Sequence, residues 1–92
     1  MRIVDVHLQP DYILSIVAED GRLGRFDVSP YLRFEAFEDL RRPGEFAKVF
    51  NGGYFVEWDC GADLSADTIE ARWQVIEAAV DVLTSAQTGM KM

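Results

Sequence analysis

The sequence predicts an α+β domain: a four-stranded, mainly antiparallel sheet with a short helix near residues 43–49 and a longer C-terminal helix near residues 65–85. Apolar and polar residues alternate over much of residues 2–28, which is the period of half-buried strands. A tight-turn dipeptide, Asp20-Gly21, interrupts that region. From residue 63 onward the apolar spacing changes to that of an amphipathic helix.

The first three strands are expected at residues 2–8, 12–19 and 22–28. In the first of them, one side carries the apolar residues Val4, Val6 and Leu8. The second strand is apolar on both faces, which is typical of a central strand. Because Gly21 can adopt a positive φ without steric cost, the second and third strands are expected to form a hairpin.

The middle of the chain contains turn and helix-start residues. Ser29-Pro30 predicts a short helical turn, because a capping hydroxyl precedes a proline at the first helical position. A loop is expected next, ending in the helix over residues 43–49, and Asn51-Gly52-Gly53 is expected to end that helix. Residues 54–58 alternate again and are expected to be the fourth strand of the sheet.

The predicted C-terminal helix begins at Ser65, whose hydroxyl can cap it, or at the alternative capping box that starts at Asp67. At 1.5 Å per residue it would be roughly 30 Å long. Its apolar stripe recurs every three or four residues, at Ile69, Trp73, Ile76, Val80 and Leu83. One domain over residues 1–85 is expected, with a frayed tail over residues 86–92.

Charge and cysteine content exclude several classes of function. The chain has 16 acidic and 9 basic residues, a net charge of −7, and no basic stripe, so direct nucleic-acid binding is not expected. The acidic surface is consistent with simple solubility or with docking to a basic partner.

The single cysteine, Cys60, excludes an intrachain disulfide. With no apolar run long enough for a signal peptide or a membrane span, a cytoplasmic location is expected.

An ordered series of short motifs resembles a small bacterial family catalogued as domain-of-unknown-function family 2442. The similarity covers roughly residues 2–70, and the series is more specific than any one of its motifs. It departs from the family pattern at Asp59-Cys60, where members usually have a proline after the tryptophan, and in the helix expected to continue past residue 70. The motifs are Phe26-Asp27-Val28-Ser29-Pro30-Tyr31-Leu32, Phe37-Glu38-Asp39-Leu40 with Phe46 and Val49, Glu57-Trp58, Gly61, and Asp63-Leu64-Ser65-Ala66-Asp67-Thr68-Ile69.

This resemblance implies a small α+β fold, an antiparallel sheet with short helices, and no established activity or catalytic residues. Members of the family occur alone or before a helix-turn-helix domain, and some are encoded beside another small domain in a toxin–antitoxin-like arrangement. The resemblance therefore suggests an antitoxin-like component as one alternative function.

Catalytic chemistry finds little support in the residues, and no catalytic residue, cofactor or metal ligand is expected. The only histidine, His7, is placed within a strand beside Asp5, and the neighbour of Cys60 is the acidic Asp59 and not a basic residue that would activate a thiol. One alternative remains open: a weak metal-dependent enzyme or metal-binding domain that uses the carboxylates of Glu57, Asp59 and Asp63.

Partner docking is the hypothesis that the residues favour. The predicted terminal helix carries a wider apolar arc than a four-stranded sheet needs, so one part would cover its own sheet and another would contact a second protein. The alternative is that the sheet buries the whole helix; an outer strand is a second candidate surface. We therefore expect a non-enzymatic, regulatory protein-interaction module, either homodimeric or bound to a small partner protein. Its expected interface residues are Trp73, Ile76, Val80 and Leu83.

Overall fold

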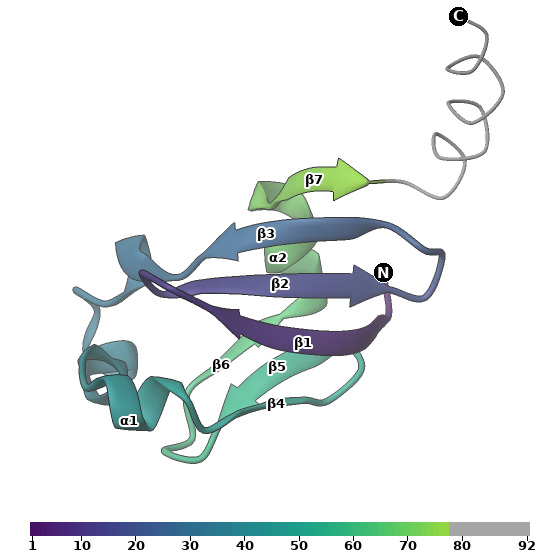
Figure 1. The fold of residues 1–92 in the computed structure, drawn as a ribbon. Helices are drawn as coiled ribbons and strands as arrows, with labels where there is room; N and C mark the ends of the chain where they lie inside the picture. The colour runs from purple at the N-terminus through teal and green to yellow at the C-terminus, as the bar shows by residue number, and fades with distance from the viewer. Residues whose placement is uncertain (78–92) are drawn as a thin grey trace, which may run out of the picture.

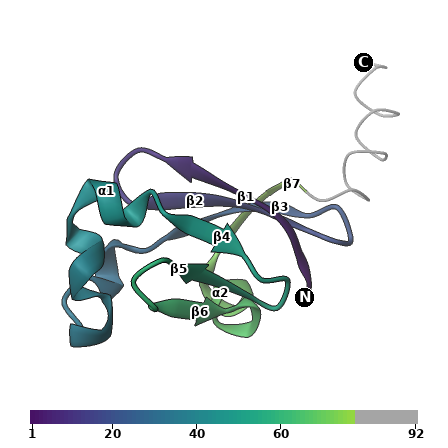
Figure 2. The same cartoon turned by 90° about the horizontal axis from the view of Figure 1, so that it is seen from below.

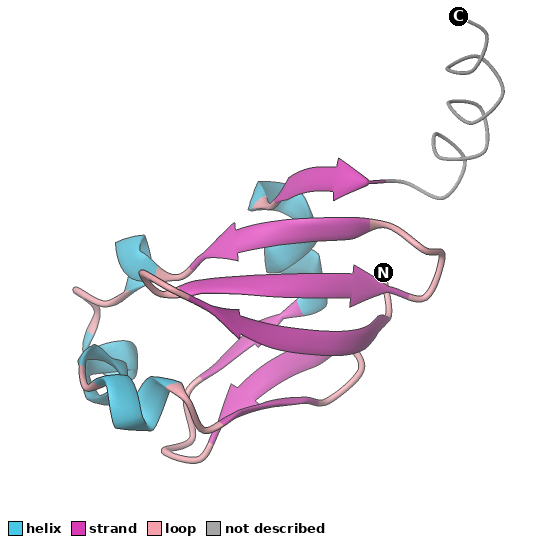
Figure 3. Ribbon diagram, in the orientation of Figure 1, coloured by secondary structure: helices cyan, strands magenta, loops and turns pink. Residues whose placement is uncertain are grey.

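The computed structural model describes residues 1–77 and confirms the α+β class, with the strands divided between two antiparallel sheets (Figures 1 and 3). The four-stranded sheet has the order β1-β2-β3-β7, with β1 at Ile3–Gln9, β2 at Ile13–Ala18, β3 at Leu23–Asp27 and β7 at Gln74–Glu77. The three-stranded sheet has the order β4-β5-β6, with strands at Val49–Asn51, Phe55–Trp58 and Asp63–Ser65. In Figure 2 the two sheets lie in separate layers.

The β2–β3 hairpin forms as predicted. Ile16 lies opposite Gly24, and the strands turn through Asp20-Gly21 with a φ of 94° at Gly21. The side chain of Asp20 accepts a hydrogen bond from the backbone N–H of Arg22, which supports the turn. The inward-facing residues of β2 are buried and the outward-facing ones are half-buried, as expected of a strand inside a sheet.

A bulge in β1 corrects the predicted faces of that strand. The register with β2 shifts between Ile3 and Asp5, so Val4 is an extra residue in the ladder. Ile3 is 1% exposed and Val4 is 46% exposed, whereas Val6, beyond the bulge, packs against the core. The expectation that Val4 shares a face with Val6 was therefore wrong, because one inserted residue inverts the alternation.

Short helices connect β3 to the second sheet. The turn predicted at Ser29-Pro30 is the 3₁₀ helix η1 (Ser29–Tyr31), but Ser29 does not cap it: Asp27 Oδ1 accepts hydrogen bonds from the backbone N–H and the hydroxyl of Ser29. A second 3₁₀ helix, η2 (Glu35–Arg41), occupies part of the expected loop. The helix predicted over residues 43–49 forms only in its first part, as α1 (Pro43–Phe46); its predicted end was wrong, because Val49 begins strand β4.

The strand predicted over residues 54–58 exists, as β5, but it belongs to the three-stranded sheet. Asn51-Gly52-Gly53 does not end a helix; it turns β4 into β5, with Asn51 Oδ1 accepting from the Gly53 N–H at 2.7 Å and a φ of 88° at Gly53. Residues 49–65 thus form a local meander of three strands. Because the turns between these strands are short, the strands pair with one another and not with the four-stranded sheet.

The long C-terminal helix is the main correction. Helix α2 spans Ala66–Arg72, and Ser65 caps it as predicted, since its Oγ accepts from the Thr68 N–H at 3.1 Å. At Trp73 the backbone becomes extended, with a ψ of 164°, and residues 74–77 form β7. The predicted helix over residues 65–85 is therefore wrong for residues 73–77, while Val80, Leu83 and the proposed boundary near residue 85 lie outside the described residues.

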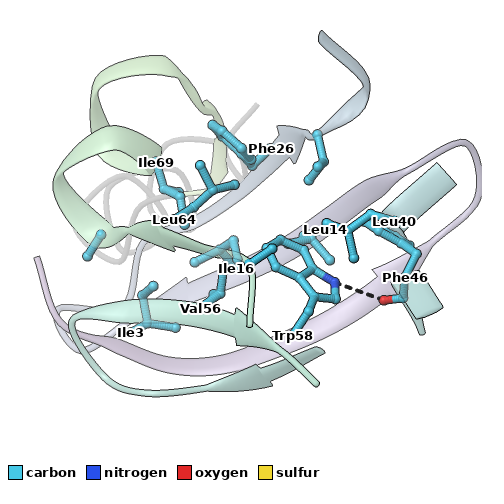
Figure 4. Close-up of a cluster of buried hydrophobic side chains, with 13 residues drawn as sticks. Ile3, Leu14, Ile16, Phe26, Leu40, Phe46, Val56, Trp58, Leu64 and Ile69 are labelled. Carbon is cyan, nitrogen blue, oxygen red and sulfur yellow. Dashed lines mark hydrogen bonds between the residues drawn. The ribbon is translucent and has the colours of Figure 1, made fainter. Parts of the chain in front are cut away.

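The core lies between the two sheets and receives side chains from both, from α2 and from the connecting helices (Figure 4). Trp58 is its largest fully buried side chain, and its indole Nε1–H donates to the carbonyl of Phe46 at 3.0 Å. The labelled core residues in Figure 4 are Ile3, Leu14, Ile16, Phe26, Leu40, Phe46, Val56, Trp58, Leu64 and Ile69.

Candidate docking edge

Strand β7 is one edge of the four-stranded sheet, and β1 is the other (Figure 1). Within residues 1–77 it pairs only with β3, with Gln74 opposite Arg25 and Val75 opposite Gly24. The ladder shifts after this point, because the next paired residue of β7 is Glu77, opposite Leu23. Ile76 therefore has no cross-strand partner on β3 and is the inserted residue of a bulge.

Trp73 holds β7 against the sheet. Its backbone N–H donates to the Ile69 carbonyl at 2.8 Å, and its partly buried ring packs against the core. The ring lies so close to Gly24 that a Cβ there would meet Trp73 Cε3 at 2.5 Å. The guanidinium of Arg22 lies over the indole, 5.4 Å from the ring centre. Position 24 therefore requires a glycine, because any side chain there would collide with the Trp73 ring.

An ionic cluster supports the same junction from the side of α2. Glu70 accepts a hydrogen bond from the α-amino group of Met1 at 2.9 Å and another from Arg22 at 2.8 Å. Arg22 also donates to Asp20 in the β2–β3 turn. The hydrogen bond from the α-amino group, followed by that from Arg22, lowers the pKa of Glu70, and the hydrogen bond to Glu70 raises the pKa of Arg22.

The side chains of β7 leave apolar surface on this edge. Val75 is 44% exposed and Ile76 is 49% exposed. The strand is Gln74-Val75-Ile76-Glu77, so Glu77 is its only charged residue, and it contains no proline. A second extended chain can therefore hydrogen-bond to the open side of β7 and cover both residues.

The opposite edge of the sheet is partly closed by the chain itself. The N–H of Ile3 in β1 donates to the Gly53 carbonyl at 2.6 Å, and the side-chain amide of Asn51 donates to the Ile3 carbonyl at 3.0 Å. The turn between β4 and β5 therefore occupies the start of β1. Of the two edges, β7 is the better candidate for an intermolecular contact.

Two of the four predicted interface residues are described, and they do not share a helix: Trp73 follows the end of α2, and Ile76 is on β7. Trp73 and Ile76 both lie at the β7 edge, but Trp73 is turned into the molecule while Ile76 is exposed. Val80 and Leu83 lie outside the described residues. Sequence reasoning placed Val75 in the wide apolar arc of the predicted helix and missed the strand. The neighbouring β-branched residues Val75 and Ile76, together with a glycine in the middle of β3, were the available indications.

The carboxylates proposed as an alternative metal site do not form one. Glu57 is half-buried in β5 opposite Asp63 of β6, and Asp59 lies in the turn that joins these strands. Within residues 1–77, no three His, Cys, Asp or Glu side chains are grouped closely enough to hold a metal ion. Of the other candidates, Cys60 is exposed, and His7 Nε2 lies 2.8 Å from Asp5 Oδ2 on the exposed face of β1.

Comparison with known proteins yields one match. The model of a family described as a protein of unknown function, DUF2442, matches residues 3–75. Neither the comparison with curated proteins nor that with solved structures finds a match. Among residues 1–77, no helix has the length and apolar character needed to cross a membrane.

Proposed function

Since the chain belongs to the DUF2442 family of proteins of unknown function, we propose from its own geometry that it is a non-enzymatic, regulatory protein-interaction module that docks through the edge of β7. The single observation that carries the proposal is the pair Val75 and Ile76, two adjacent apolar residues that are exposed on an edge strand. The mode of docking is strand addition, in which backbone hydrogen bonds supply affinity and the two apolar side chains supply specificity.

The occupant that this edge favours is a second copy of the chain. Twofold contacts are self-complementary, and two β7 strands related by a twofold axis would pair antiparallel and join two four-stranded sheets into one. Such pairing brings the exposed Val75 and Ile76 of both copies together near the axis. In this arrangement the backbone N–H and C=O groups on the outer side of one β7 strand hydrogen-bond to those of the other.

The test is the oligomeric state of the full chain and of two lysine variants, measured by sedimentation velocity. Ile76→Lys should shift the protein from dimer to monomer, because a lysine on an edge strand opposes pairing. The matched control is Val4→Lys, since Val4 is exposed to a similar degree, 46%, but lies on β1. A monomeric parent protein, or equal dissociation in both variants, would reject the β7 dimer.

A small basic partner protein is the second candidate, and the net charge of −7 favours it. An antitoxin-like component that masks a basic protein belongs to this class. In that case the parent chain is monomeric alone, and Ile76→Lys abolishes capture of the partner whereas Val4→Lys does not. Co-expression with the product of the neighbouring gene, followed by purification of the complex, tests this arrangement.

A further inference from the structure

A cavity distinct from the β7 edge lies between η1 and the end of α2. It has a volume of about 500 Å³. Pockets of roughly 300–1,000 Å³ are the usual size for small-molecule sites. Its lining comes from one run of the chain, residues 26–34, and from a single residue of α2, and includes Phe26, Asp27, Tyr31, Arg33, Phe34 and Arg72.

Three aromatic side chains form one wall of this cavity. Tyr31 lies between the other two, with ring centres 5.8 Å from Phe26 and 6.5 Å from Phe34. Phe26 is fully buried in the core, but Phe34 is 48% exposed, so packing within the described residues does not account for its position. A planar ligand in the cavity would cover Phe34 and stack against Tyr31.

Two guanidinium groups, those of Arg33 and Arg72, line the same cavity. Among residues 1–76, four arginines form no ion pair, namely Arg25, Arg33, Arg41 and Arg72, whereas Arg2, Arg22 and Arg42 each pair with an acid. Arg33 instead lies over the ring of Phe34, 5.1 Å from its centre. The cavity thus brings together two of the arginines that form no ion pair among residues 1–76, and guanidinium groups at a pocket are well suited to bind an anion from outside.

Asp27 limits the charge that the cavity can accept. One of its carboxylate oxygens is engaged, accepting hydrogen bonds from the backbone N–H and the hydroxyl of Ser29 at 2.9 and 2.7 Å. Two guanidinium groups and this one carboxylate leave a single positive charge at the cavity. A monoanion balances that charge, whereas a dianion such as a phosphate monoester would exceed it.

We propose that this cavity binds a small aromatic monocarboxylate, with its ring against Tyr31 and Phe34 and its carboxylate held by Arg33 and Arg72. Guanidinium groups bind carboxylates through paired N–H donors, which orients a planar acid relative to the aromatic wall. The ligand site lies in the segment that joins β3 to the short helices, and it does not depend on docking at β7.

The test is titration of the full-length ¹⁵N-labelled protein with benzoate, 4-hydroxybenzoate and indole-3-acetate, followed by amide chemical shifts. Three comparison probes separate the contributions: benzamide has the ring without the charge, acetate has the charge without the ring, and phenyl phosphate is a dianion. At least one aromatic carboxylate should give saturable shifts at residues 26–34 and 72. Acetate and benzamide should bind at least tenfold more weakly, and phenyl phosphate should not be preferred.

Three arginine variants complete the experiment. Arg33→Gln and Arg72→Gln should each weaken binding of the aromatic carboxylate about tenfold, the usual effect of losing one charge-assisted contact. Arg25→Gln is the matched control, because Arg25 is exposed, forms no ion pair among residues 1–76 and does not line the cavity. No saturable binding of any carboxylate, equal binding of benzamide, a preference for phenyl phosphate, or equal loss in all three variants would each overturn the proposal.

Discussion

Gly24 shows how one missing side chain positions the docking edge. Without a Cβ, β3 leaves room for the Trp73 ring, and the ring holds the first residues of β7 in place. Any larger residue at this position must displace either the indole or the Gln74 carbonyl, whose oxygen would lie 3.0 Å from the added Cβ.

Gly24→Ala should therefore destabilise the protein by about 1–3 kcal/mol, the usual cost of overpacking. It should also change the Trp73 fluorescence, and denaturant unfolding with fluorescence detection measures both effects. Gly44→Ala is the control, since no atom lies within 4 Å of its added methyl, and it should be neutral or slightly stabilising. An unchanged free energy of unfolding in Gly24→Ala would contradict the contact.

Glu70 should make part of the stability depend on pH. Its pKa is lower in the folded chain than its ordinary value of 4.5, so ionised Glu70 stabilises the fold above about pH 4.5. That contribution is lost as the pH falls through the lower pKa of the folded state. Glu70→Gln should lower the Tm at pH 7, and the difference from the parent protein should shrink below pH 4.5.

Thermal unfolding at several pH values measures this difference. Glu38→Gln is the control, because Glu38 is exposed and makes no ion pair with the described residues, so its Tm difference should stay small at every pH. A Glu70→Gln difference that stays constant from pH 7 to pH 3 would exclude an ionic role for the cluster of Met1, Arg22 and Glu70.

At the scale of elements, β7 depends on a single aromatic anchor. Trp73 is the link between the end of α2 and the strand, whereas Val75 and Ile76 contribute little to the core because they are exposed. The strand is therefore the part of the four-stranded sheet whose attachment is most sensitive to one substitution.

Trp73→Ala should release β7 from β3 while leaving β1 and β2 paired. Since the indole is only partly buried, the loss of stability should be about 1–3 kcal/mol, below the roughly 3–5 kcal/mol expected for a fully buried tryptophan such as Trp58. Amide hydrogen exchange should accelerate at the β3 positions that face β7 and remain slow in β2. Equal acceleration in β2 would show that Trp73 supports the whole sheet.

At the scale of the whole molecule, net charge distinguishes the two kinds of partner. Two copies of a chain with a charge of −7 repel each other, and salt screens that repulsion. A homodimer should therefore tighten as ionic strength rises, whereas a complex with a basic protein should weaken. Sedimentation equilibrium at low and high salt measures the direction; weakening of the homodimer with salt would contradict an apolar contact at β7.

Local sequence determined several features of this protein correctly. The β2–β3 hairpin follows from alternation and from a glycine at the turn, and the start of α2 follows from Ser65, because these effects act between residues close in the chain. The short helix near Pro43 is also local. The interface predicted at Trp73, Ile76, Val80 and Leu83 stays a prediction; the structure places Trp73 at the end of α2 and Ile76 on β7.

Tertiary structure decided the rest. The spacing of Ile69, Trp73 and Ile76 fits a helix, but residues 74–77 instead complete the open side of β3, where backbone hydrogen bonds and the space over Gly24 exist only once the sheet has formed. The same holds for the division of the strands into two sheets and for the aromatic cavity that joins residues 26–34 to Arg72. Contacts between distant segments select among conformations that local periodicity leaves almost equal in free energy.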